Sequence, residues 1–210
     1  MAEKDLDWKF AEELVVESEL ISGARAHALE HGVDSVSPAQ GAQLAVLAAA
    51  TNAKSIIEIG TGFGVSGLWM LTGAPASALT SIDQEVEFQQ SAKKSFADLG
   101  IPANRTRLIA GRALDVLPRM NESSYDLVLV DADPGPLLEY VEHALRLVRV
   151  GGTVLVPHAL WRGRVADPAQ RDDTATTFRT LLTETAGSPA VRSAVSLAGD
   201  GLLQLTKVAP

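Results

Sequence analysis

The segment that most constrains the fold is a short apolar run, Ile56 to Ile59, followed by glycines at alternate positions, Gly60, Gly62 and Gly64. An apolar run of this length that ends in glycines is typical of a buried parallel strand that turns sharply into a helix. Glycine has no Cβ, so the backbone of the turn can approach a ligand closely. Amides at the start of the next helix can then bind a polar head group. The segment therefore predicts a strand, a ligand-binding loop and a helix.

One acid, Glu58, interrupts this apolar run. A carboxylate near the end of a central strand is costly to bury unless polar groups satisfy it. We therefore expect Glu58 either to bond to nearby backbone amides or to face a bound cofactor.

The glycines fit two cofactor-binding patterns. Read from Gly62, the spacing Gly-x-Gly-x-x-Gly matches the dinucleotide fingerprint, and Asp83 lies near the distance expected for a ribose-binding acid. Read from Glu58, the pattern acid-x-Gly-x-Gly-x-Gly resembles the first motif of class I S-adenosylmethionine-dependent methyltransferases, whose cofactor has no pyrophosphate. A glycine-rich turn that binds no ligand is the third interpretation, and the loop alone leaves all three open.

Strand-like and helix-like segments alternate along most of the chain. Apolar residues three and four apart predict one helix over Trp8–Glu30, and Ser37 with Pro38 predicts the start of another that runs to about Thr51. Strands that alternate with helices predict parallel pairing through right-handed crossovers, with both faces of the sheet covered. The strands are expected at Ser55–Ile59, Ala78–Ile82, Thr106–Ile109, Tyr125–Val130 and Thr153–Val156, and the helices between them from Val65, over Glu85–Leu99, over Leu114–Arg119 and over Leu137–Val148.

The pattern changes after a helix expected near Thr174–Thr185. Two strand-like runs, Val191–Leu197 and Leu202–Val208, flank Gly199-Asp200-Gly201, which predicts an antiparallel hairpin. Class I methyltransferases close their parallel sheet with such a hairpin, whereas dinucleotide-binding folds usually end in a parallel strand. We expect an α/β fold: a doubly wound, mostly parallel, seven-stranded sheet with a C-terminal antiparallel hairpin.

Length and charge narrow the function classes. A chain of 210 residues can bury one substantial core, so we expect a single domain in which residues 1–51 form a helical cover and residues 52–210 a Rossmann-like core. The net charge is −8, from 18 basic and 26 acidic residues, which disfavours a nucleic-acid partner. The chain has no cysteine, which excludes disulfides and thiolate metal sites. The longest apolar run, Leu44–Ala50, is too short to span a bilayer and the N-terminus has no signal-like apolar region, so we expect a cytoplasmic protein.

Polar side chains follow the expected strands where a ligand would bind. In open α/β sheets the ligand lies outside the carboxyl ends of the strands. Asp83 suits a bidentate acceptor for two ribose hydroxyls, and it could at the same time cap the helix that follows it. The residues at these strand ends are Glu58, Asp83, Gly111-Arg112-Ala113, Asp131-Ala132-Asp133 and Pro157-His158.

Together these motifs resemble bacterial members of the catechol and caffeoyl-coenzyme A O-methyltransferase-like family, most of all its actinobacterial branch. The similarity runs from about Val36 to Val208. Its marks are Ser37-Pro38-x-x-Gly41, Glu58-Ile59-Gly60-Thr61-Gly62 with Ser66, Ser81-Ile82-Asp83, Val130-Asp131-Ala132-Asp133, Leu160-Trp161-x-Gly163-x-Val165-x-Asp167 and Gly199-Asp200-Gly201.

The resemblance implies an S-adenosylmethionine-dependent O-methyltransferase that methylates a hydroxyl of a small molecule and forms homodimers through its N-terminal helices. It also implies where the cofactor binds. The methionine end would be held by Val36, Glu58, Gly60, Thr61 and Ser66, the ribose by Asp83 and Gln84, and the adenine near Ala113, with Asp131 and Asp133 beside the cofactor amino group and the metal or substrate position.

The chain departs from this family at the metal site. Metal-dependent members carry Asp-Ala-Asp-Lys after the fourth strand and Asp-Asn after the fifth, whereas this chain has Pro134 in place of the Lys and Pro157-His158 in place of the Asp-Asn. Asp131 is the one ligand retained. One carboxylate and one imidazole suit Mg²⁺ poorly, although they could hold Zn²⁺ or Mn²⁺ if a further ligand joined them. We expect methyl transfer without the usual divalent metal.

The missing Lys leaves the base for the acceptor hydroxyl to be found. We predict His158, together with Asp131, as the catalytic pair, because His158 follows a strand end and an imidazole titrates near neutrality. A histidine bonded to the loop backbone is the alternative. His27, His31 and His143 are expected on the surface without a role.

Two other functions stay open. One is a non-catalytic S-adenosylmethionine-binding protein of the same fold, which the missing Lys and metal ligands favour. The other is an NAD-dependent oxidoreductase, which Glu58 and the terminal hairpin disfavour.

Overall fold

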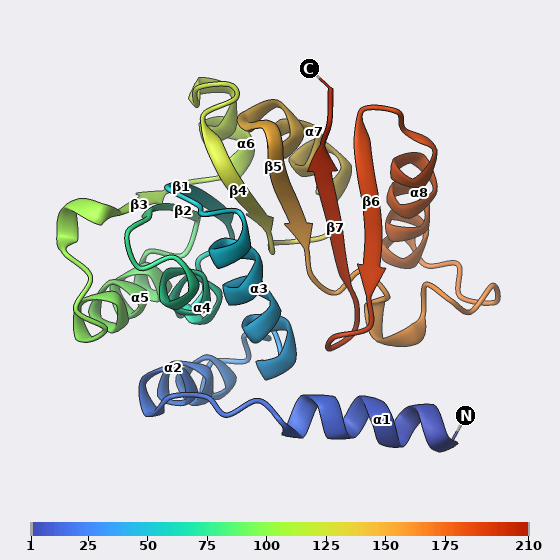
Figure 1. Cartoon of the computed structure of the whole chain (residues 1–210), viewed down its shortest axis with the longest axis horizontal. Coiled ribbons are helices and arrows are strands. Elements are labelled where there is room, and N and C mark those ends of the chain that lie inside the picture. Colours follow the sequence, from blue (N-terminus) through green and yellow to red (C-terminus); the bar gives the residue numbers. More distant parts are fainter. Residues whose placement is uncertain (1, 210) are drawn as a thin grey trace.

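A computed structural model describes residues 2–209 of the chain. Its centre is a seven-stranded sheet in the order β3-β2-β1-β4-β5-β7-β6 (Figure 1). The first five strands pair in parallel, and β7 runs antiparallel to both β5 and β6. The predicted fold and its closing hairpin are confirmed. The strands are β1 Ser55–Ile59, β2 Ala78–Asp83, β3 Thr106–Ala110, β4 Tyr125–Val130, β5 Val148–Val156, β6 Val191–Ser196 and β7 Leu202–Lys207.

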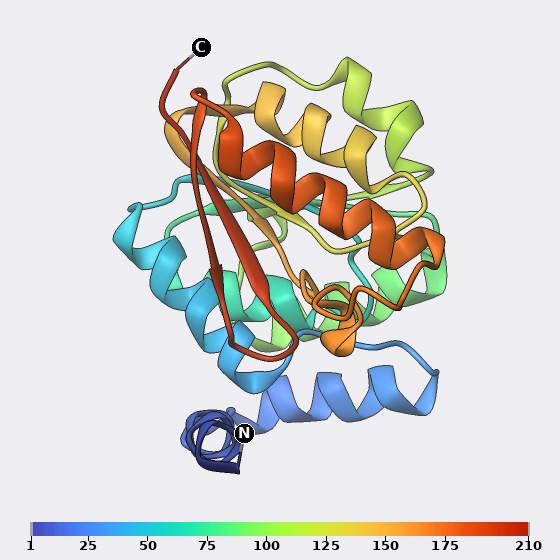
Figure 2. The ribbon, with the colours of Figure 1, turned by 90° about the vertical axis from the view of Figure 1, so that its right-hand side faces the viewer.

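Helices cover both faces of the sheet (Figure 2). One face packs against α3 Pro38–Ala50, α4 Val65–Gly73 and α5 Val86–Asp98, and α2 Glu19–Glu30 lies on α4 and α5. The other face packs against α6 Ala113–Val116, α7 Leu137–Leu147 and α8 Asp173–Gly187. The described residues also form three short 3₁₀ helices, Ala103–Arg105, Leu117–Arg119 and Trp161–Gly163. Among residues 2–209, no helix is both long enough and apolar enough to cross a membrane.

The central strands are buried on both faces, which explains their continuous apolar runs. Side chains alternate between the faces along a strand. In β4, Leu127 and Leu129 pack with α3, α4 and α5, while Val128 and Val130 pack with α6, α7 and α8. Because β1 lies between β2 and β4, the chain reverses its direction of travel across the sheet there. This switch point lies at the carboxyl ends of β1 and β4, where open α/β sheets bind their ligands.

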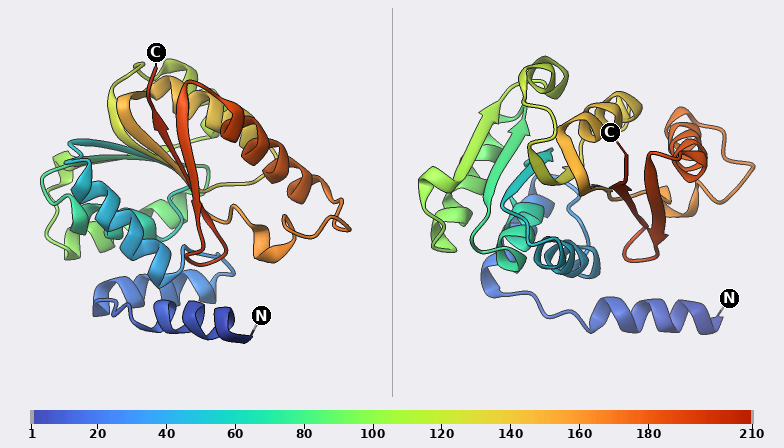
Figure 3. Two further views of the ribbon diagram at one scale, coloured as in Figure 1. Left: turned by 45° about the vertical axis from the view of Figure 1, so that its right-hand side comes forward. Right: turned by 45° about the horizontal axis from the view of Figure 1, so that its top comes forward.

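The prediction of a single N-terminal helix over Trp8–Glu30 is wrong. The structure has two helices, α1 Ala2–Glu13 and α2, because Ser18 adopts an extended backbone and its hydroxyl caps the start of α2 by accepting a bond from Ile21 N. Helix α1 lies along one edge of the molecule, next to the turn between β6 and β7 (Figure 3). Trp8 fastens it there, since its Nε1 donates to Leu197 O at 3.0 Å.

Two further local predictions have different outcomes. The helix start at Ser37 is confirmed, because Ser37 and Gln40 form a capping box at the N-terminus of α3. Strand β5, in contrast, begins at Val148 instead of Thr153. Val148 pairs with Tyr125 and Thr153 with Leu127, so the expected Gly151-Gly152 turn is an irregularity inside the strand.

Candidate functional site

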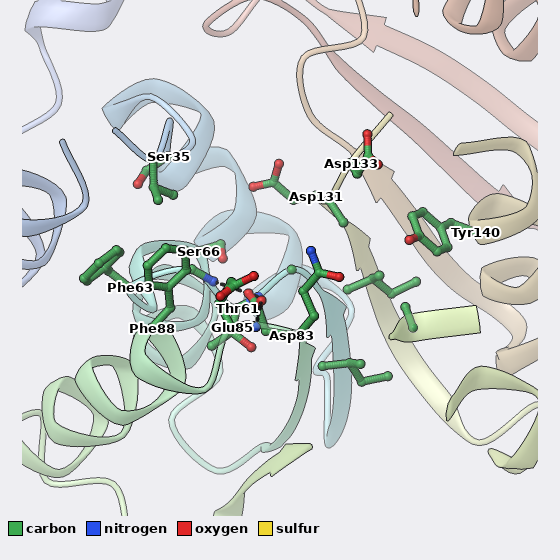
Figure 4. A pocket seen from close by; sticks show the side chains of 18 of the residues that line it. Ser35, Thr61, Phe63, Ser66, Asp83, Glu85, Phe88, Asp131, Asp133 and Tyr140 are labelled. Atoms are coloured by element: carbon green, nitrogen blue, oxygen red, sulfur yellow. Dashed lines mark hydrogen bonds between the residues drawn. The ribbon is translucent and has the colours of Figure 1, made fainter. Parts of the chain in front are cut away.

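A cavity of about 320 Å³ opens at the switch point (Figure 4). Its walls come from the loops that follow β1, β2, β3 and β4 and from the segment before α3. The predicted cofactor-binding residues meet here with one exception, Glu58. Those that line the cavity are Val36, Gly60, Thr61, Ser66, Asp83, Gln84, Ala113, Asp131 and Asp133.

Gly60 brings the ends of β1 and β4 together at the floor of the cavity. Its φ is +95°, and a Cβ at this position would lie 1.8 Å from the backbone oxygen of Asp131. The strands are joined here by Asp131 N, which donates to Ile59 O at 2.8 Å. Only glycine therefore allows the β1 loop to pass this close to the end of β4.

Asp83 organises the glycine loop. Its Oδ2 accepts bonds from Thr61 N at 2.8 Å and Gly62 N at 2.9 Å, while Oδ1 accepts from Glu85 N at 2.9 Å. Figure 4 shows Thr61, Asp83 and Glu85 gathered on one side of the cavity. The carboxylate thus holds the loop and the start of α5 together, and it still lines the cavity, so the helix-start role and a ribose contact are compatible.

Glu58 lies beneath the loop and does not line the cavity. It is fully buried, and its Oε2 accepts a 2.8 Å bond from the Ser66 hydroxyl. Within the described part of the chain, Oε1 has no hydrogen-bond partner. Burial raises the pKa of Glu58 to about 8, although the hydrogen bond from Ser66 opposes the shift. Its partner is a side-chain hydroxyl and not a backbone amide, and contact with a cofactor stays a prediction.

Three aromatic side chains line the cavity, and the sequence analysis missed them. The rings of Phe63 and Phe88 lie 4.8 Å apart between centroids, and Tyr140 of α7 stands on the far wall (Figure 4). His27 and His31 are exposed, as expected, but their rings contact Phe63 at 4.7 and 5.0 Å. Phe63 stands inside the glycine motif, and this position in the sequence could have indicated that its ring lines the cavity.

Three titratable side chains meet beside the cavity at the ends of β4 and β5. The Nδ1 of His158 lies 2.8 Å from Asp200 Oδ1, and its Nε2 lies 3.6 Å from Asp131 Oδ1. Each side chain keeps about a fifth of its surface exposed. Asp131 lines the cavity, whereas His158 is not among the residues that line it. Asp200 was predicted only as a turn residue, because a contact across 42 positions leaves no mark in the sequence.

The charges in this group depend on one another. Burial alone would lower the pKa of His158, but the hydrogen bond to Asp200 and the charges of Asp131, Asp200 and Asp34 outweigh it and raise the pKa to about 8. Burial raises the pKa of Asp131, and the positive charge of His158 partly offsets this. Burial also opposes ionisation of Asp200, yet the bond from His158 holds its pKa below the usual value. The site therefore stabilises a positive ring between negative carboxylates.

The chain is similar in sequence to known proteins. The model of a family described as O-methyltransferase matches residues 11–208. A probable O-methyltransferase of Mycobacterium tuberculosis (strain H37Rv) is 42% identical over 197 residues, which cover 93% of this chain and 88% of that protein.

Solved structures show the same fold. A protein from Corynebacterium glutamicum is 30% identical with a TM-score of 0.88, and the match covers 100% of this chain and 99% of that chain. The O-methyltransferase TomG from Streptomyces achromogenes, involved in tomaymycin synthesis and solved in complex with S-adenosylmethionine, is 31% identical. Its TM-score is 0.84, and the match covers 98% of this chain and 96% of TomG.

Proposed function

The chain belongs to the O-methyltransferase family, and on that premise we propose that it transfers the methyl group of S-adenosylmethionine to a hydroxyl of a small molecule. Membership decides between the two glycine patterns in favour of the methyltransferase pattern and leaves the NAD-dependent alternative without support. The observation that carries the proposal is the meeting of the predicted binding residues around one cavity at the switch point.

This cavity fits the cofactor that TomG binds. Its volume of about 320 Å³ falls in the range of small-molecule sites, and its wall combines apolar rings with polar loop residues. Asp83 and Gln84 would hold the ribose, Ala113 and Phe88 would flank the adenine, and Gly60, Thr61 and Ser66 would hold the methionine end. When bound, S-adenosylmethionine supplies a methyl carbon on a positive sulfur, which an acceptor oxygen attacks in line.

The residues of the chain then have to position the acceptor and remove its proton. Asp131 and Asp133 line the side of the cavity next to His158. In the proposal, His158 in its neutral form takes the hydroxyl proton, and Asp131 orients the acceptor and balances the charge that the ring gains.

A divalent metal does not fit the residues present. The side chain of Pro157 offers no ligand atom, and the His158 ring stands between two carboxylates, with Nδ1 on Asp200 and Nε2 towards Asp131. The two carboxylates therefore face different nitrogens and do not converge on one point. Among the side chains of residues 6–209, three of ligand type converge only at His27, Glu30 and His31, on the surface at the end of α2. The retained Asp131 is thus proposed as a catalytic residue and not as a metal ligand.

The experiment that tests the proposal is a calorimetric titration of S-adenosylmethionine into the wild-type chain and Asp83→Ala. It is repeated with EDTA and with Mg²⁺, Mn²⁺ or Zn²⁺. Binding that weakens in the variant and ignores the metals supports the cofactor site. Labelled S-adenosylmethionine is then incubated with a panel of phenols and catechols. Binding without transfer to any hydroxyl supports the non-catalytic alternative, and no binding overturns the proposal.

We also propose a homodimer and a single domain in which residues 1–51 cover the core. Apolar side chains of the N-terminal segment face solvent: Leu6, Phe10 and Leu14 are each 67% exposed and Val16 is 88% exposed. A second copy would cover such side chains. Light scattering of the wild type and of a Phe10→Lys variant tests this, since a monomeric wild type would reject the dimer. Cytoplasmic location and the absence of a nucleic-acid partner stay predictions.

A further inference from the structure

The turn between β6 and β7 lies against the loop that carries His158. Three contacts join these segments: Ala159 N donates to Gly201 O at 3.0 Å, Leu160 N donates to Asp200 O at 2.8 Å, and His158 Nδ1 lies 2.8 Å from Asp200 Oδ1. Two of these are backbone bonds, so the register between the segments is fixed independently of the side chains. The Asp200 carboxylate is thereby delivered to one nitrogen of the His158 ring.

Two glycines allow the turn to approach its neighbours this closely. A Cβ at Gly201, where φ is +100°, would lie 2.6 Å from Leu160 Cγ and 2.9 Å from Leu160 N. A Cβ at Gly199, where φ is +58°, would lie 2.5 Å from Gln40 Cδ. No side chain fits at either position, so Asp200 projects from a turn that is packed on both sides.

Helices α1 and α3 hold the other side of the turn. The buried Gln40 donates from Nε2 to Gly201 O at 3.2 Å, and Glu12 accepts a 2.6 Å bond from Gly199 N. Trp8 Nε1 donates to Leu197 O and to Gly199 O. The carboxylate of Asp200 is therefore positioned by two helices that lie far from it in sequence.

The contact also sets the hydrogen positions on the His158 ring. An ionised carboxylate only accepts hydrogen bonds, so Nδ1 must carry the hydrogen that faces Asp200. The hydrogen bond at one ring nitrogen decides which role is left for the other. Nε2 is then the nitrogen that exchanges a proton, and it faces Asp131 at 3.6 Å, at the edge of the cavity. His158 keeps this direction despite a left-handed backbone, with φ of +59°.

We propose that Asp200 is a positioning residue for methyl transfer: it accepts the Nδ1 hydrogen of His158 and aims Nε2 at the acceptor side of the cavity. This inference rests on the proposed function, in which the acceptor oxygen gives its proton to Nε2 while Nδ1 keeps its own. Without Asp200 the hydrogen can move to Nε2, and the ring then presents a donor where the reaction needs an acceptor.

If Asp200 only held the hairpin in place, its loss would lower stability without changing the His158 tautomer. Two measurements separate that role from positioning of the ring. The first is ¹⁵N NMR of the protein with labelled histidine, in the wild type, Asp200→Asn, Asp200→Ala and the control Asp173→Asn, an exposed acid on α8. The chain has four histidines, and His158→Gln identifies the signals of interest. At a pH above the His158 pKa of about 8, where the ring is neutral, we expect His158 to carry its hydrogen on Nδ1 in the wild type and the control, and to lose this preference in Asp200→Ala.

The second readout is turnover with a phenol that the wild type methylates. Asp200→Ala should lower kcat by about a hundredfold, which is the loss of rate expected when a general base points in the wrong direction. The Kd of S-adenosylmethionine and the thermal midpoint should change little. Asp200→Asn keeps an acceptor oxygen and should fall in between. An unchanged His158 tautomer in Asp200→Ala, or a loss of kcat only in step with lost folding, overturns the inference. A wild type that methylates no phenol instead removes the proposed function, and the NMR result then decides the positioning of His158 by itself.

Discussion

Ser66 donates a 2.8 Å hydrogen bond to Glu58 and so connects the cavity wall to a fully buried carboxyl group. The acid lies in the middle of the sheet, with one oxygen bonded to Ser66 and the other without a partner among the described residues. A charged carboxylate in such a place is costly, and the pKa of about 8 expresses this cost. Glu58 therefore couples the stability of the central strand to pH.

The first prediction concerns this coupling. The folded pKa of Glu58 is about 8 and the ordinary value is 4.5. Between these values the folded chain holds a proton that the unfolded chain has released, so the contribution of Glu58 to stability is complete below pH 4.5 and is lost as the pH rises through 8. Glu58→Gln, which stays neutral, should gain on the order of a few kcal/mol over the wild type between pH 5 and pH 8.5.

Thermal melting of both proteins from pH 5 to pH 8.5 measures this difference, with Glu87→Gln, an exposed acid of α5, as the control. The folded pKa of His158 is also raised, to about 8, so its stabilising contribution is lost in both proteins as the pH rises from 6.5 through 8. This loss is the same in both proteins and cancels in the comparison. A difference that stays constant across this range would mean that Glu58 is ionised in the folded protein.

The second prediction is that Gly60→Ala damages the floor of the cavity. A left-handed backbone alone costs an alanine about 1 to 2 kcal/mol. At Gly60 the new Cβ would also lie 1.8 Å from the Asp131 oxygen, so the ends of β1 and β4 must separate. Gly100→Ala is the matched control, because its φ is +81° and no atom lies within 4 Å of the added Cβ.

Urea unfolding and calorimetry with S-adenosylmethionine should separate these two effects. Gly100→Ala is expected to lose only the backbone cost and to keep its affinity. Gly60→Ala is expected to lose clearly more stability and at least tenfold in affinity. Equal losses in both variants would show that the close approach at Asp131 has no consequence.

Most of the core was predictable from the sequence, and the reason is burial on both faces. Apolar runs such as Tyr125–Val130 have the length of a strand and end at glycines or acids, so their bounds match the structure. The break between α1 and α2 was missed because apolar spacing continues through it, and only the cap formed by Ser18 reveals it. The contact between Asp200 and His158 was not predictable, since it depends on how a hairpin folds back across 42 positions.

The third prediction follows from the carboxylates around His158. Burial lowers the pKa of the ring, but the bond to Asp200 in the β6–β7 turn and the charges of Asp131 after β4, Asp200 and Asp34 before α3 outweigh it and raise the pKa to about 8. A base must be neutral to accept a proton, so the rate of methyl transfer should rise with pH until about 8 and then level. In His158→Gln the remaining rate should be lower by a factor of about 10² to 10⁴, and this rise should disappear. A pH profile of kcat/KM for the phenol acceptor measures both, and an unaltered profile in the variant would exclude His158 as the base.

The last prediction concerns Gln40, which joins the start of α3 to the β6–β7 turn. Its Oε1 accepts a bond from Ser37 N at 2.9 Å, and its Nε2 donates to Gly201 O at 3.2 Å. Gln40 is only 1% exposed, and Gln40→Leu removes the acceptor of Ser37 N and one of the two donors to Gly201 O, which keeps its bond from Ala159 N. The loss at Ser37 N should cost about 1 to 3 kcal/mol.

Gln40→Leu should therefore lower the thermal midpoint by several degrees, whereas Gln90→Leu on the exposed side of α5 should not. Because the same turn carries Asp200, the variant should also disturb the tautomer of His158 while both residues of the pair are still present. If Gln40→Leu keeps the wild-type histidine spectrum despite a lower midpoint, the turn is fixed by its backbone bonds to Ala159 and Leu160. Gln40 then contributes to stability alone.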